Sequence, residues 1–228
     1  MKIALFLFAA ALAAAAAPAP APLAKVRAWP VYDARTAGET DFGDLCRMAR
    51  LPCGAVASKG ENLAAPSGPI SGQTVGAILD RILAAHPGYA AETRDGVLSV
   101  RRPGSACAAA LERPARKARY PVQSARVASW MVLRAAGWPG LANAGLASLT
   151  GDAEDARYLR VQVMIHGGAR VRQTLDAIAR GDGRMLWLAE DDGKSCSGFR
   201  FLDWRAPQPV ETSSVLVSVS GPDAPPRP

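Results

Sequence analysis

Histidine is scarce in this chain, and the cysteine spacings that build metal sites are missing. His86 and His166 are the only histidines among 228 residues, and the four cysteines form no CxxC pair. A structural zinc site needs several such ligands at close spacing, so we expect neither a metal site nor a cofactor. The Gly-Lys-Ser sequence at 193–195 imitates the end of a phosphate-binding loop. Leu188 stands where that loop needs its first glycine, which excludes nucleotide binding by this route.

Few residues are suited to catalysis. No GxSxG sequence occurs. His86 precedes Pro87 at a predicted helix end, where an imidazole can complement the helix dipole, and His166 lies in a Gly-rich loop. Asp80 and Asp176 occupy equivalent places in two predicted helices, and each directly follows a predicted core leucine in the sequence. We expect both on the polar side of their helices rather than in a paired-carboxylate site, and therefore predict a protein that is not an enzyme and has no small-molecule substrate.

Apart from one N-terminal run, the chain has no long apolar stretch. Residues 3–17 are uninterrupted apolar, which is shorter than the roughly 20 residues of a membrane-spanning helix. The alternation of proline and alanine at 18–22 then ends any helix. This layout is typical of a secretory signal peptide, which we place at 1–24, and a retained N-terminal anchor is the alternative. The protein is expected in the periplasm or outside the cell.

The four cysteines fit that destination, because an even number in an exported chain favours disulfides. Cys46 and Cys53 would be about 10 Å apart along a continuous helix, beyond disulfide reach. Pro52 ends the helix between them, so the chain can turn back. We expect one disulfide between Cys46 and Cys53 and a second between Cys107 and Cys196. Free buried thiols are the alternative.

The positive charge is concentrated in one segment. The formal net charge is +7, and residues 101–126 hold seven basic residues and one acid, Glu112. The basic residues are Arg101, Arg102, Arg113, Arg116, Lys117, Arg119 and Arg126. Such a segment can bind anionic lipid, acidic cell-wall polymer or nucleic acid by electrostatic attraction, and a solvated linker is the alternative.

An internal repeat with an offset of 96 residues predicts the fold. Val75 matches Val171 and Leu79 matches Leu175, and both stretches show the apolar spacing of an amphipathic helix. Each helix is followed by a predicted hairpin, the first turning at Asp95. Each half also has a similar helix upstream of the repeated one, and the first of these covers Phe42 to Ala49.

The sequence therefore predicts an α+β protein of two tandem small modules, each with two helices on short strands and a C-terminal hairpin. The modules are placed at 25–103 and 118–206, with a basic linker at 104–117. A strand near 213–219 and a proline-rich end complete the chain at 207–228.

The first module resembles the short N-terminal domain shared by secretins and TonB-dependent receptors, the STN domain. The likeness rests on Ile70 to Val75, on the Ile78-Leu79-Asp80 core and on Asp95 to Val100, and it is looser in the second half. The resemblance implies a small, non-enzymatic α+β module of the bacterial envelope that contacts another protein. A secretin, a pilus protein or a TonB-system component is the partner that it suggests.

Overall fold

The computed structural model describes residues 23–31, 40–138, 159–203 and 214–221. The predicted signal peptide, except for its last two residues, and the proline-rich end lie outside these ranges. The described residues contain both helices and strands, which confirms the predicted α+β class.

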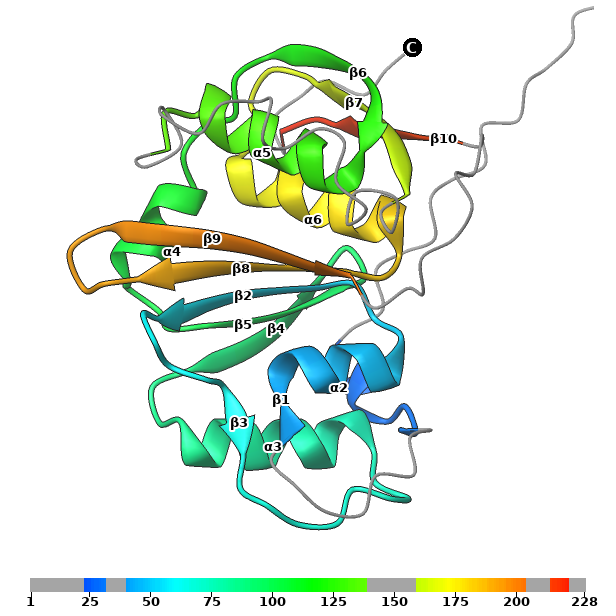
Figure 1. Cartoon of the computed structure of the whole chain (residues 1–228), viewed down its shortest axis with the longest axis vertical. Helices are drawn as coiled ribbons and strands as arrows, with labels where there is room; N and C mark the ends of the chain where they lie inside the picture. Colours follow the sequence, from blue (N-terminus) through cyan, green and yellow to red (C-terminus); the bar gives the residue numbers. More distant parts are fainter. Residues whose placement is uncertain (1–22, 32–39, 139–158, 204–213, 222–228) are drawn as a thin grey trace, which may run out of the picture.

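A five-stranded mixed sheet crosses the middle of the molecule (Figure 1). Its strands lie in the order β4-β5-β2-β8-β9. Their bounds are Cys53–Ser58 for β2, Ala90–Arg94 for β4, Val97–Arg101 for β5, Met185–Asp191 for β8 and Cys196–Asp203 for β9. The central strand β2 pairs in parallel with both β5 and β8, whereas β4-β5 and β8-β9 are antiparallel hairpins. Strands from the two halves of the chain therefore share one sheet.

One face of this sheet is covered by the N-terminal helices and a two-stranded ribbon (Figure 1). These elements are α1 (Leu23–Arg27), β1 (Thr40–Asp41), α2 (Phe42–Ala49), β3 (Ala64–Ala65) and α3 (Val75–Ala85). The N-caps explain where the two longer helices begin. Asp41 accepts a hydrogen bond from the backbone N–H of Asp44 at 2.7 Å, and the Thr74 hydroxyl accepts one from the N–H of Ala77 at 3.3 Å.

The opposite face is covered by α5 (Ala125–Ala135) and α6 (Val171–Asp182). These helices are in turn covered by a three-stranded sheet, so that the two helices lie between two sheets (Figure 1). This sheet consists of β6 (Ala118–Ser124), β7 (Arg160–Ile165) and β10 (Ser214–Val219), in the order β10-β7-β6. Strand β7 is central, with β10 parallel and β6 antiparallel to it.

The segment predicted as a basic linker, residues 104–117, contains the short helix α4 (Ala106–Leu111). Leu111 is fully buried, and the backbone N–H of Ala115 donates to the carbonyl of Ala169 at 2.7 Å. The segment is therefore part of the folded body. Together with the shared central sheet, this packing joins the two halves more closely than the prediction of tandem modules with a linker implies.

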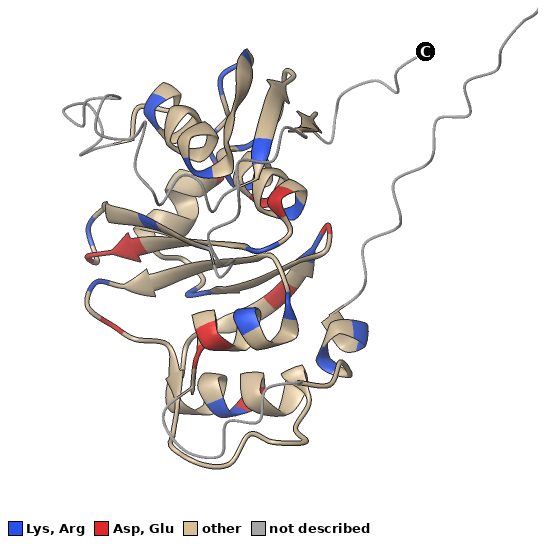
Figure 2. Cartoon of the chain, turned by 45° about the vertical axis from the view of Figure 1, so that its right-hand side comes forward, with Lys and Arg blue, Asp and Glu red and all other residues tan. Residues whose placement is uncertain are grey.

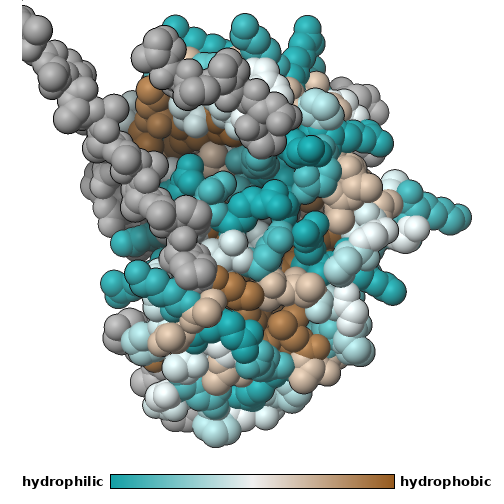
Figure 3. Space-filling view, turned by 180° about the vertical axis from the view of Figure 1, so that it is seen from behind, coloured by the Kyte–Doolittle hydropathy of each residue, from teal (hydrophilic) through white to brown (hydrophobic). Residues whose placement is uncertain are grey.

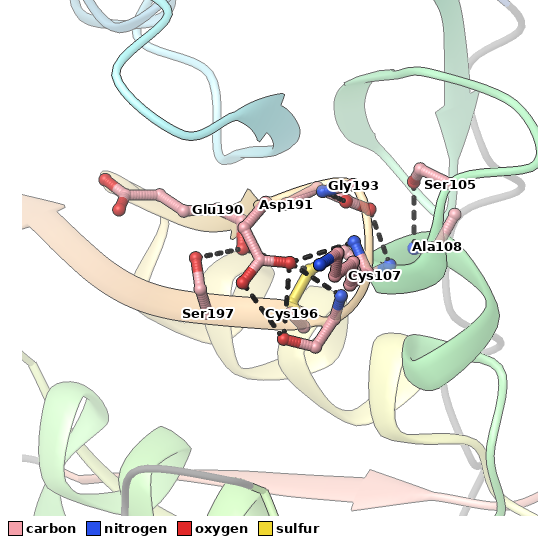
Figure 4. Close-up of a disulfide and its surroundings, with 11 residues drawn as sticks. Ser105, Cys107, Ala108, Glu190, Asp191, Gly193, Cys196 and Ser197 are labelled. Carbon is pink, nitrogen blue, oxygen red and sulfur yellow. Dashed lines mark hydrogen bonds between the residues drawn. A yellow bond between two sulfur atoms is a disulfide. The ribbon is translucent and has the colours of Figure 1, made fainter.

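Both expected disulfides are present. Cys46–Cys53 joins the end of α2 to the start of β2, with 6.3 Å between the Cα atoms. Cys107–Cys196 joins α4 to β9 at 4.4 Å (Figure 4). Beside it, the Asp191 carboxylate accepts hydrogen bonds from the backbone N–H of Cys107 at 2.8 Å and from that of Gly193 at 2.7 Å. The carboxylate thus satisfies an N-terminal amide of α4.

Candidate functional site

Strand β10 forms one edge of the three-stranded sheet and is the least protected edge strand among the described residues. It pairs with β7 over six successive residues without a bulge, and its sequence, SVLVSV, has neither a charge nor a proline. Natural edge strands usually carry such features because they prevent pairing with other chains. The opposite edge, β6, has both Pro121 and a bulge between Tyr120 and Gln123. Strand β4 carries Glu92, and β9 carries the exposed Arg200.

Packing on α6 holds β10 in place. Val217 and Val219 are buried, and a Cβ added at Gly181 of α6 would lie 2.8 Å from Val217 Cγ2. The small residue in the helix therefore allows the strand to approach closely. Leu216, on the opposite face of the strand, is 56% exposed, and Val215 is also exposed. Figure 3 shows hydrophobic residues gathered at the upper left, the end of the molecule where the three-stranded sheet lies.

The outer face of the three-stranded sheet is basic. Alternation along β7 turns Val161, Val163 and Ile165 inward and leaves Arg160, Gln162 and Met164 on the outside. Arg119 of β6 is directly opposite Met164, so it shares that face. None of the three strands contains Asp or Glu, and Figure 2 accordingly shows them in blue and tan.

Asp182, at the end of α6, is held by the backbone at the start of β7. Asp182 is buried, and its carboxylate accepts hydrogen bonds from the backbone N–H of Leu159 and of Arg184. The outer sheet face thus combines cations with exposed apolar side chains. We call the surface formed by Leu216, Met164, Arg119 and Arg160 the basic sheet face.

The seven predicted basic binding residues are placed in different environments. Five of them are exposed: Arg102, Arg113, Arg116, Lys117 and Arg119. Arg101 is half-buried and its guanidinium lies 3.3 Å from Glu92 Oε2, and Arg126 is half-buried on α5. Four of the exposed cations, Arg113, Arg116, Lys117 and Arg119, therefore lie close together in the chain, leading into β6.

A buried charge cluster lies between α6 and the five-stranded sheet. Arg172 of α6 is 2% exposed, and its Nη1 donates to Glu92 of β4. Its Nε lies 2.9 Å from Glu112 Oε1, close enough for an ion pair but outside hydrogen-bond geometry, and Nη2 has no hydrogen-bond partner among the described residues. Burial raises the pKa of Glu92, but the hydrogen bond and charge of Arg172 lower it more, so the net pKa lies below 4.5.

Asp176 belongs to the same region, and the prediction that it lies on the polar side of its helix is wrong. It is 2% exposed, its Oδ1 accepts a hydrogen bond from Trp187 Nε1 at 2.9 Å, and its Oδ2 has no partner within the described part of the chain. Burial raises the pKa of Asp176 to about 7, against the opposing effects of Arg172 and Trp187. Asp80 is exposed as predicted and pairs with Arg27 of α1.

The two histidines hold segments together. His86 is the C-cap of α3, as expected at a helix end. Its Nδ1 lies 2.8 Å from Glu61 Oε1, and the Tyr89 hydroxyl donates to Glu61 Oε2 at 2.6 Å. Burial raises the pKa of Glu61. The hydrogen bonds of Tyr89 and His86 have the opposite and larger effect, so the net pKa lies below 4.5. His166 Nε2 lies 3.1 Å from Ser218 Oγ, linking the end of β7 to β10.

The Gly-Lys-Ser sequence at 193–195 forms the turn between β8 and β9 and is followed by a strand. Within the described ranges, no three or more His, Cys, Asp or Glu side chains are grouped as metal ligands. No described helix is long and apolar enough to cross a membrane.

The position of β10 at a sheet edge and the buried charge on α6 were not predicted from the sequence. The signal for a strand was available in SVLVSV, which is uncharged and has valine at every second position, whereas its place at the edge depends on pairing with a strand distant in the chain. No matching family model, curated protein or solved structure was found for this chain.

Proposed function

We propose that this chain is an exported, non-enzymatic adaptor of the bacterial cell envelope, which binds an extended segment of another protein at β10. The observation that carries the proposal is the edge of β10, which among the described strands pairs with β7 alone and exposes Leu216. An extended peptide can add a strand to such an edge, with main-chain hydrogen bonds giving affinity and alternate side chains giving specificity. The N-terminal apolar run and the STN resemblance support the envelope setting.

The order of elements supports a description as two divergent STN-like modules. The first half follows β1-α2-β2-β3-α3 with the hairpin β4-β5, and the second follows β6-α5-β7-α6 with the hairpin β8-β9. In each half, an antiparallel pair involves the strand before the first helix, β1 with β3 and β6 with β7. The described part of the second half has no counterpart of β2. Strand β2 instead pairs with hairpin strands of both halves, so the two modules would share it.

Photocrosslinking in the native envelope tests the proposal. A photoreactive residue at Ser214 on β10 should capture one discrete protein, and the same residue at the exposed Ser197 of β9 should not. Adding Leu216→Ser to the protein that carries the photoreactive residue at Ser214 should strongly reduce the yield of the adduct, because it removes the exposed apolar contact. Leu202→Ser is the matched control, since Leu202 is an exposed leucine on another edge strand.

The captured partner is then purified and titrated against the variants. Burying one leucine is worth about 1.5–3 kcal/mol, and Leu216 is already partly covered, so L216S should weaken binding about tenfold. L202S should change the affinity less than about twofold. Equal adducts from both crosslinking positions, or an unchanged affinity for L216S, would contradict strand addition at β10.

Electrostatic binding of an acidic envelope component or a nucleic acid is the second candidate. The observation in its favour is that Arg113, Arg116, Lys117 and Arg119 are all exposed within seven residues. Replacing these four by glutamine should abolish retention on an anionic surface and remove its salt dependence. Unchanged retention of the quadruple variant would eliminate this candidate.

A further inference from the structure

From the charge of the basic sheet face we infer that the segment added at β10 is acidic as well as apolar. This inference rests on the proposed function and specifies the chemistry of its partner. A strand added beside β10 presents alternate side chains to the two faces of the sheet. On the outer face, these side chains would extend the surface that already includes Leu216, Met164, Arg119 and Arg160.

The distances support an electrostatic contribution. Ser214 of β10 is directly opposite Arg160 of β7, so an added strand lies two strand spacings, or about 10 Å, from the Arg160 backbone. The Arg160 guanidinium donates to the carbonyl of Val122 on β6 at 3.5 Å, so its side chain would have to turn away from β6 to come nearer the added strand. About 10 Å is also the Debye length at 0.1 M salt, so a carboxylate on the added strand still senses this cation. Each such pair in a water-like medium changes affinity on the order of twofold.

The same charges argue against a second copy of this chain as the occupant. Two β10 strands paired about a twofold axis would join two faces that both carry Arg119 and Arg160 and no acid in their strands. Like charges across an interface oppose association. An acidic segment of a different protein instead matches the cations, while its apolar residues cover Leu216, the most exposed of the large hydrophobic side chains among the described residues.

Three synthetic peptides test the inference by fluorescence anisotropy on the intact mature protein. Each is an extended peptide of about nine residues in which every second residue is valine, and the residues between, which share the other face, alternate between leucine and a variable residue that is Glu, Gln or Lys. At low salt the Glu peptide should bind about fourfold more tightly than the Gln peptide, at about twofold for each of two carboxylates, and more tightly still than the Lys peptide. Raising the salt concentration should remove most of that preference.

Two variants connect the preference to the sheet. Arg119→Gln combined with Arg160→Gln should weaken the Glu peptide several-fold and leave the Gln peptide unchanged. Arg102→Gln is the matched control, because Arg102 is exposed on the loop after β5 and should affect neither peptide. A circular dichroism spectrum that matches the wild type shows that the double variant has folded.

The outcomes separate this inference from the proposed function. Equal affinity for all three peptides, with L216S weakening each, overturns the acidic partner and leaves strand addition standing. No binding of any peptide, together with no effect of L216S on native crosslinking, overturns both. Binding to vesicles of anionic phospholipid that exceeds binding to the Glu peptide and does not depend on Leu216 would also overturn the inference, because the cations would then serve a membrane surface.

Discussion

Asp176→Asn tests whether α6 carries a carboxyl group that binds a proton near neutral pH. Burial raises the pKa of Asp176 to about 7, while Arg172 and the hydrogen bond from Trp187 act in the opposite direction. Asparagine has nearly the same shape, and its Oδ1 can still accept the hydrogen bond that Trp187 donates. The substitution therefore removes the titration and leaves the packing of α6 against β8 largely intact.

The sign and size of the effect follow from linkage between proton binding and folding. A raised pKa means that the folded protein holds the proton more tightly than the unfolded chain does. The resulting stabilisation is fully present below pH 3.8, the ordinary pKa, and is lost as the pH rises through about 7. At roughly 1.4 kcal/mol for each pH unit, the whole difference is about 4 kcal/mol. About 3 kcal/mol of it falls between about pH 5 and pH 8.

Urea unfolding followed by tryptophan fluorescence, with the disulfides intact, measures this effect. The free energy of unfolding of the wild type relative to D176N should fall by about 3 kcal/mol between about pH 5 and pH 8. Asp80→Asn is the matched control, because Asp80 has the equivalent place in α3 and its side chain is 58% exposed. D80N should follow the wild-type pH profile. Parallel profiles for the wild type and D176N would refute a buried, protonated Asp176.

Three other substitutions test the packing between the two halves. Arg172→Met should lower the free energy of unfolding in urea by about 3 kcal/mol, because Glu92 and Glu112 lose the cation that they face. A loss below about 1 kcal/mol would contradict this role. Gly54→Ala should lower the free energy of unfolding by about 2 kcal/mol and lower Tm, because a Cβ there would lie 2.2 Å from the Trp187 ring. Gly167→Ala is the control and should leave Tm nearly unchanged, because a Cβ there would meet no atom within 4 Å. Replacing both cysteines of the α4–β9 disulfide by serine should lower the free energy of unfolding in urea by about 4–5 kcal/mol, and the same change in the α2–β2 disulfide should lower it by about 2–3 kcal/mol. The reason is the length of the closed loop, since the sequence separations are 89 and 7, and equal losses would refute it.

Local elements of the fold could be predicted from the sequence because their signals are local. Apolar spacing located α3 and α6, and the Asp95-Gly96 pair located the β4-β5 hairpin. The pairing of β2 with β8 could not be predicted, because it joins strands that are distant in the chain. One signal was present in β2 itself. Residues 53–57 of its sequence, CGAVA, show no alternation with polar residues, which is typical of a strand covered on both faces, and the structure buries all five.

The error at Asp176 has a related cause. Helical spacing shows which side of α6 is apolar, but it does not show whether a second sheet covers the other side. The helix lies between the five-stranded sheet and the sheet of β7 and β10, and nine of its twelve residues are buried. The polar positions of α6 are therefore inside the protein. Asp80, at the matching place in α3, is instead exposed and pairs with Arg27 of α1.

The position of α6 also bears on how tightly β10 can bind a partner. Val217 packs β10 against Gly181 at the end of α6, and Arg172 near its start is bonded to Glu92 of the first half. A strand added at β10 would therefore meet an edge that is already ordered by contacts with both halves. Association costs conformational entropy for every segment that it orders. Here that cost would fall on the partner's segment, so of two segments with the same residues, the one that is more extended before binding should bind more tightly.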